Sequence, residues 1–125
     1  MKDIYTVRNE NIKGIFRDVE NKMKEVFHTK LYCIILYGSY ARNENTAESD
    51  IDILVLVNDE EKSLRRYEDI ITDIMVDLSL EYGVVLSLYI QSVEEYKKQV
   101  KVLPFLMNIQ KEGVKIYEQH DNRIG

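Results

Sequence analysis

Apolar residues recur every three or four positions in two long segments of the chain, which is the spacing of an amphipathic helix. The first segment covers residues 12–27 and the second covers residues 64–78, with charged residues at most of the positions between. We expect the second helix to end at Gly83, because glycine is often found just past a helix C-terminus. Each helix would bury one apolar face.

Shorter apolar runs lie between and after these helices and predict strands. Three runs, at residues 31–37, 50–57 and 84–90, are too short for core helices and are rich in branched apolar residues. A fourth run, residues 114–117, is a candidate for a last short strand. The pattern therefore predicts three or four strands.

Two further helices are predicted near the C-terminus. Ser92 and Glu95 have the Ser-x-x-Glu spacing of a capping box, in which the two side chains bond to free backbone N–H groups at a helix start. Pro104 suits the first turn of a second short helix, and Gly113 lies just past its end.

The order of elements is helix, strand, strand, helix, strand, helix, helix and candidate strand. This order predicts a small mixed α/β (α+β) domain in which helices pack a sheet of three or four strands. The 125 residues of the chain fit one domain. We assign residues 1–118 to this domain and residues 119–125 to a polar C-terminal tail.

The charge balance narrows the function classes. Seventeen Lys and Arg against 22 Asp and Glu give a net charge of −5, which argues against stable nucleic-acid binding through a broadly basic surface. No apolar run approaches the ~18 residues of a membrane span, and the N-terminus has no signal-peptide core. We therefore expect a cytoplasmic protein that does not bind membranes.

Two carboxylates open the second predicted strand. Asp50 and Asp52 are two residues apart, so their side chains would share one face, with Cα atoms roughly 6.6 Å apart. Such a pair can hold hard divalent cations such as Mg²⁺. An Asp-x-Asp alone is more often a solvated strand edge or a turn. Its joint occurrence with Gly38 and Ser39, at the end of the preceding strand, favours a functional site.

The segment from Gly38 to Arg42 has the features of a phosphate-binding turn. Gly38 lets the backbone approach a ligand closely, and Ser39 contributes a hydroxyl and an N–H group. A helical turn over residues 40–42 would direct its free N–H groups to the same place. Arg42 could add a cation, or could simply be solvent-exposed. Tyr40 could stack on a nucleotide base, or could lie at an interface.

The pattern Gly38-Ser39, ten residues, then Asp50-x-Asp52 resembles the signature of the minimal nucleotidyltransferases, which belong to the DNA polymerase beta-like superfamily. The resemblance implies a nucleotidyltransferase fold that binds a nucleoside triphosphate with Mg²⁺, with ATP as the expected substrate. It implies that Gly38 and Ser39 hold the triphosphate. Asp50 and Asp52 would be the metal-binding and catalytic residues, and pyrophosphate would leave.

The chain departs from this family at one position. Active members usually carry a third carboxylate on a neighbouring strand, yet the run at residues 84–90 contains neither Asp nor Glu. Ser87 is the expected occupant of that position, and Asp77 and Glu81, the nearest upstream acids, fall in the predicted helix. Tyr89 is a candidate for the site or an interface. The chain could therefore be a slow enzyme or an inactive nucleotide-binding relative.

The resemblance also implies a partner. Minimal nucleotidyltransferases of this size resemble the antitoxin half of a module whose other half is a HEPN-type RNase toxin, and they attach AMP to a tyrosine of that toxin. The alternative is a catalytically weak relative that neutralises its partner by complex formation. An antibiotic-modifying nucleotidyltransferase is a third, less favoured reading, because an added aminoglycoside-binding domain is not evident. The sequence leaves open whether the protein forms homo- or hetero-oligomers.

Overall fold

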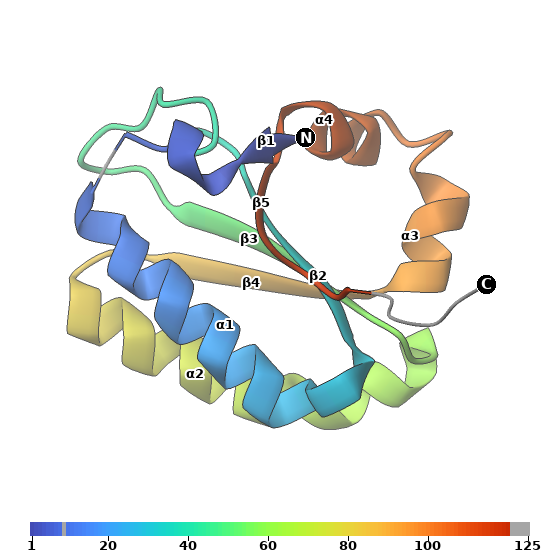
Figure 1. Ribbon diagram of the computed structural model, residues 1–125. Coiled ribbons are helices and arrows are strands. Elements are labelled where there is room, and N and C mark those ends of the chain that lie inside the picture. Colours follow the sequence, from blue (N-terminus) through green and yellow to red (C-terminus); the bar gives the residue numbers. More distant parts are fainter. Residues whose placement is uncertain (9, 121–125) are drawn as a thin grey trace.

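Five strands form one mixed sheet in the computed structural model, which describes residues 1–8 and 10–120 (Figure 1). Strand β2 pairs antiparallel with both β3 and β5, whereas β3 pairs parallel with β4 and β1 pairs parallel with β5. In their order across the sheet, the strands are β1 (Lys2–Asp3), β5 (Val114–Glu118), β2 (Leu31–Tyr37), β3 (Ile51–Val57) and β4 (Leu86–Ser92).

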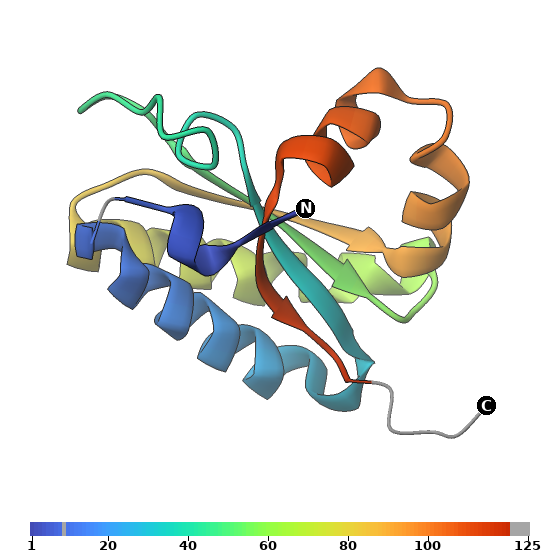
Figure 2. The ribbon, with the colours of Figure 1, turned by 45° about the horizontal axis from the view of Figure 1, so that its top comes forward.

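Helices cover both faces of this sheet (Figures 1 and 2). Helices α1 (Lys13–Phe27) and α2 (Glu68–Tyr82) lie on one face, and α3 (Val93–Gln99) and α4 (Pro104–Glu112) lie on the other. No helix of the described residues has the length and apolar character needed to cross a membrane. Among the described residues there are also four 3-10 helices: Ile4–Thr6, Glu10–Ile12, His28–Lys30 and Glu61–Tyr67.

Strand β3 is buried on both faces and connects the two halves of the core. Ile53 and Val55 pack in the cluster that contains α1 and α2, whereas Leu54 and Leu56 pack in the cluster that contains α3 and α4. This double burial explains why the strand is uniformly apolar after its first residues. Because side chains alternate along a strand, Asp52 lies on the face of Leu54 and Leu56.

The predicted elements are confirmed, with corrections at their ends and in the strand count. The sheet has five strands rather than three or four, because β1 is a two-residue strand whose partner β5 lies at the other end of the chain. The strand predicted at residues 84–90 runs from Leu86 to Ser92. Strand β3 begins at Ile51, so Asp50 directly precedes it.

The predicted end of α2 and start of α3 are confirmed, whereas residues 64–67, predicted as the start of the second helix, belong to a 3-10 helix that precedes α2. Gly83 ends α2 in the left-handed conformation, and its N–H group bonds to the Ser79 carbonyl at 2.9 Å. The Ser92 side chain accepts a hydrogen bond from the Glu95 N–H at the start of α3. Of the predicted tail, residues 121–125 lie outside the described residues.

Candidate functional site

Gly38 lies directly against the carboxylate of Asp52. A Cβ atom built on Gly38 would lie 2.6 Å from Oδ2 of Asp52, and Gly38 has a φ of +78°. This geometry follows from the sheet, since Tyr37 at the end of β2 is the register partner of Asp52 on β3. Both the limited space and the left-handed conformation therefore require glycine at this position. The turn after β2 thus lies beside the start of β3.

The residues after Gly38 form a tight helical turn. The N–H groups of Ala41 and Arg42 donate to the Gly38 carbonyl at 3.1 and 3.3 Å, and the N–H of Glu44 donates to the Ser39 carbonyl at 2.9 Å. The N–H groups of Ser39 and Tyr40 come before these donors, as the first N–H groups of a helix do. Such groups bind anions, and phosphate is a common one.

The N-terminal segment holds this turn in place. The Lys2 ammonium donates to the Ala41 carbonyl at 2.7 Å. The Asn43 side chain accepts from the Arg8 N–H at 3.0 Å and donates to the Thr6 carbonyl at 2.9 Å. Sequence reasoning missed this brace, because its partners lie more than thirty positions apart and have no spacing pattern.

Asp50 and Asp52 form a pair of neighbouring negative charges. Asp50 is exposed and Asp52 is half-buried. Burial raises the pKa of the Asp52 carboxyl above its usual value, and the negative charge of Asp50 raises this pKa further. Within the described part of the chain, neither carboxylate forms an ion pair. A divalent cation would relieve both the repulsion and the burial cost, so the pair fits Mg²⁺.

The position beside Asp52 on the next strand is occupied by Ser87, as expected. Ser87 is the register partner of Asp52 on β4. Asp77 and Glu81, the alternative sources of a third carboxylate, lie on α2 and so on the opposite face of the sheet from Asp52. Consistently, the described residues contain no cluster of three or more potential metal-binding side chains. The site has two carboxylates, whereas active members of the family that the sequence resembles usually have three.

Two of the expected nucleotide-binding side chains are engaged within the protein. The Tyr40 side chain is 5% exposed and belongs to the core cluster, so its ring packs rather than stacking on a base, and that expectation is wrong. The Arg42 guanidinium pairs with Glu44 at 3.2 Å and with Glu112 of α4 at 3.8 Å. Arg42 is 42% exposed, and its role towards phosphate stays a prediction.

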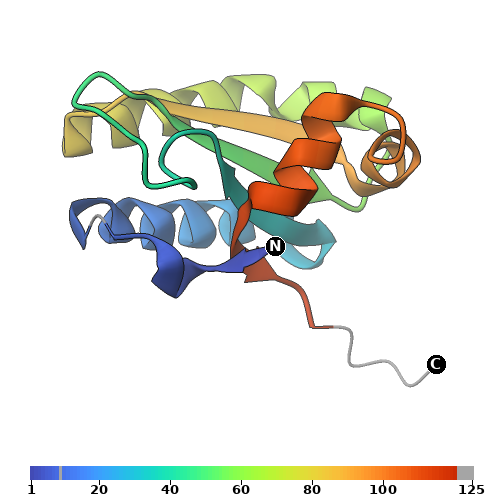
Figure 3. The same cartoon turned by 90° about the horizontal axis from the view of Figure 1, so that it is seen from above.

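Aromatic side chains line the sheet beside Asp52. The ring of Tyr37 meets the ring of Phe105 edge-on, with centroids 5.6 Å apart. Burial raises the pKa of the Tyr37 hydroxyl, and the nearby Asp52 and Tyr89 add to this effect. Sequence reasoning did not assign Phe105 to the site. Figure 3 shows the segment between β2 and β3 beside helix α4, and the ion pair between Arg42 and Glu112 joins the two.

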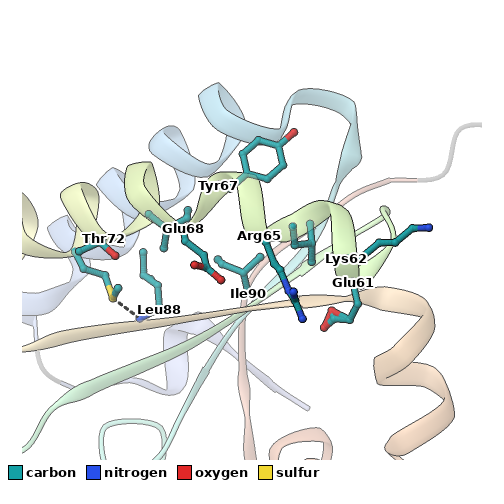
Figure 4. A pocket seen from close by; sticks show the side chains of 11 residues that line it. Glu61, Lys62, Arg65, Tyr67, Glu68, Thr72, Leu88 and Ile90 are labelled. Carbon is teal, nitrogen blue, oxygen red and sulfur yellow. Dashed lines mark hydrogen bonds between the residues drawn. The ribbon is translucent and has the colours of Figure 1, made fainter.

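Two cavities adjoin helix α2. The larger, about 650 Å³, lies between α2 and the free edge of β4, and Arg65, Glu68, Met75 and Ile90 are among its lining residues (Figure 4). It contains none of the predicted site residues. A smaller cavity of about 380 Å³ contains Asp50, together with residues of the α2–β4 connection. Of the predicted site residues, Asp50 lines the smaller cavity, whereas Gly38, Ser39 and Asp52 are not among its lining residues.

The fold, the glycine turn and the carboxylate pair are those of a nucleotidyltransferase domain. The family model described as "Nucleotidyltransferase domain" matches residues 16–116, which include every predicted site residue. The chain belongs to this family.

Two relatives come from Methanocaldococcus jannaschii, and each is named "Putative protein adenylyltransferase" (MJ0604 and MJ0141). They are 35% and 36% identical to this chain over 107 residues, or 86% of it. The matched regions cover 99% and 96% of the relatives' own lengths. The similarity therefore extends over nearly the whole of both relatives.

Two solved structures share the fold. One is described as a toxin-antitoxin with AMP-PNP, and it matches with a TM-score of 0.52 and 20% identity. The other is a variant of the toxin-antitoxin MntA-HpeT, with a TM-score of 0.52 and 18% identity. Each match covers 82% of this chain and 73% of the other chain.

Replacing Asp52 by Asn should raise the melting temperature of the metal-free protein at neutral pH. The raised pKa means that the charged carboxylate costs folding stability, and this cost appears as pH rises from the ordinary Asp pKa through the raised one. The gain should therefore vanish at pH ~2.5, well below the ordinary Asp pKa of about 3.9, where Asp52 is protonated in both states. Melting curves in EDTA at both pH values measure it.

Asp59 provides the matched control. The Glu60 N–H and the Lys30 ammonium lower the pKa of the Asp59 carboxyl, so its charged form stabilises the fold above the ordinary Asp pKa. Asp59→Asn should lower the melting temperature at neutral pH. If Asp52→Asn lowered the melting temperature as well, the electrostatic cost assigned to Asp52 would be wrong.

Proposed function

We propose that this protein transfers AMP from ATP, bound with Mg²⁺, to a hydroxyl group of a partner protein. The acceptor we propose is a tyrosine of a HEPN-type toxin, with this chain as its antitoxin. The observation that carries the proposal is the position of Gly38 against Asp52, which joins a phosphate-binding turn to a cation-binding pair. The names of the two archaeal relatives support protein adenylylation.

The residues of the site have separate tasks in this reaction. The N–H groups of Ser39 and Tyr40, with the Ser39 hydroxyl, would bind the triphosphate. Asp50 and Asp52 would hold Mg²⁺, which when bound neutralises phosphate charge and lowers the pKa of a coordinated hydroxyl. The acceptor oxygen forms a bond to the α-phosphorus, the bond from this phosphorus to the bridging oxygen breaks, and pyrophosphate leaves. The hydroxyl proton passes to solvent, since Ser87 is no base.

ATP is the nucleotide that the comparisons support best. A toxin-antitoxin structure with the same fold was solved with AMP-PNP, an analogue of ATP. A triphosphate brings strong negative charge to a site that already holds two carboxylates, so a divalent cation is needed between them. This requirement links nucleotide binding to metal binding.

Ser87 favours a second candidate function. A site with two carboxylates holds Mg²⁺ less firmly than one with three, and the chain would then bind nucleotide and neutralise its partner by complex formation alone. This binding-module function needs the same fold and the same surface, but no transfer of AMP. The two functions differ in whether a covalent product forms.

A minimal acceptor distinguishes these two functions. With ATP and Mg²⁺, the protein should convert N-acetyl-tyrosinamide at high concentration into a product heavier by one AMP, with release of pyrophosphate, as detected by mass spectrometry. N-acetyl-phenylalaninamide lacks the hydroxyl and should give no product. If Mg·ATP binds but tyrosinamide gives no product either, the binding-module function is the correct one.

Restoring a third carboxylate should strengthen the site. Ser87→Asp places a carboxylate in register with Asp52, so Mg²⁺ affinity and the rate of AMP transfer should each rise by about tenfold. Ser87→Asn has the same shape without the charge and should leave both values near those of the wild type. If the two variants behaved alike, Ser87 would not occupy the third metal-binding position.

A further inference from the structure

Two tyrosines share the face of the sheet that carries the Asp52 carboxylate. Leu88 and Ile90 of β4 pack in the cluster that contains α1 and α2, so Tyr89, which lies between them, is on the opposite face, as Asp52 is. Tyr37 of β2 is the register partner of Asp52 and packs against the cluster that contains α3 and α4. The two tyrosines therefore lie on the two strands that neighbour β3, on the same side as the carboxylate.

The strand register places Tyr89 close to Asp52. Ser87 is the register partner of Asp52, and Tyr89 comes two residues later on β4. Neighbouring strands lie ~4.8 Å apart and each residue advances by ~3.3 Å, so the Cα atoms of Tyr89 and Asp52 are about 8 Å apart. In addition to burial, Asp52 and Tyr89 both raise the pKa of the Tyr37 hydroxyl. The three side chains are therefore close neighbours.

Tyr89 is the best placed of the hydroxyl groups on this face to accept a group from a bound ligand. It is 42% exposed and belongs to neither core cluster. Tyr37 is half-buried, and its ring is held edge-on against Phe105. Ser87 is closer to Asp52, but an aliphatic hydroxyl is a much weaker acid than the phenol of a tyrosine and loses its proton less readily.

The other tyrosines with described side chains are engaged elsewhere. Tyr40 and Tyr96 are buried. The Tyr82 hydroxyl donates to the Asp18 carboxylate at 2.5 Å. The remaining rings contact side chains of other elements: Tyr32 with Lys97, Tyr67 with Phe27, and Tyr117 with Lys24.

We infer that Tyr89 is itself an acceptor of AMP, so that the protein modifies its own chain when ATP and Mg²⁺ are bound. The inference rests on the proposed function for the transfer chemistry. The Tyr89 hydroxyl oxygen forms a bond to the α-phosphorus of ATP, the bond from this phosphorus to the bridging oxygen breaks, and pyrophosphate leaves. The hydroxyl proton passes to solvent, and AMP stays attached to Tyr89 through a phosphodiester bond.

Mass spectrometry of the protein incubated with ATP and Mg²⁺ tests this inference without a partner. The denatured wild type should be heavier by one AMP, and fragmentation should locate the added group on Tyr89. Tyr89→Phe should lose the added mass. Tyr32→Phe removes a hydroxyl from the same face at the other end of β2, and it should keep the added mass. AMP on Tyr37 or Ser87 in place of Tyr89 would overturn the assignment.

A mixture of two variants tests whether the transfer occurs within one chain. The double variant Asp50→Asn, Asp52→Asn lacks the cation-binding pair but keeps Tyr89, whereas Tyr89→Phe keeps the pair but lacks the acceptor. Neither protein should gain AMP in the mixture, and the rate constant for the wild type should not change when the protein is diluted. AMP on the double variant, or a rate constant that falls in proportion to dilution, would overturn transfer within the chain.

N-acetyl-tyrosinamide separates this inference from the proposed function. If the wild type transfers AMP to tyrosinamide while its own mass stays unchanged, the modification of Tyr89 fails alone and the proposed function stands. If Mg·ATP binds but neither tyrosinamide nor Tyr89 gains AMP, the proposed transfer fails and this inference fails with it. AMP on Tyr89 of the wild type supports both.

Discussion

The close approach of Gly38 to the Asp52 carboxylate is the constraint on which the candidate site depends. It results from the antiparallel pairing of β2 with β3, in which Tyr37 lies opposite Asp52. A shift of one residue would turn the apolar side chains of β3 to the wrong faces. Because Ile53 and Leu54 are fully buried on opposite faces, the core cannot tolerate such a shift. Core packing therefore sets the geometry of the site.

The site is also a place where the fold carries an electrostatic cost. Asp52 is half-buried near Asp50, with a raised pKa and no cation beside it in the described structure. The Lys2 ammonium, which braces the neighbouring turn, bonds to the Ala41 carbonyl rather than to either carboxylate. Such an arrangement is unfavourable for the empty protein and favourable for one that binds a cation with its nucleotide. The same charges keep the surface near Asp50 acidic.

Local patterns predicted most of the fold, whereas contacts between distant segments could not be predicted. Helix α1 follows from periodicity and strand β2 from a short apolar run, and Gly38 with Asp52 follows from a fixed spacing. Strand β1 has only two residues and depends on β5 at the far end of the chain. Tyr40 follows the glycine turn like a ligand-binding residue, yet tertiary packing buries its ring. Neither feature leaves a signal in the neighbouring sequence.

The most direct test of this account is calorimetric titration of Mg·ATP into the wild type and into Gly38→Ala. The added Cβ would displace the Asp52 carboxylate, so binding should weaken by at least about tenfold. Gly83→Ala is the matched control, because Gly83 also has a positive φ but has no atom within 4 Å of the added Cβ. Its Mg·ATP affinity should equal that of the wild type. Unchanged affinity in Gly38→Ala would contradict the assignment of this site.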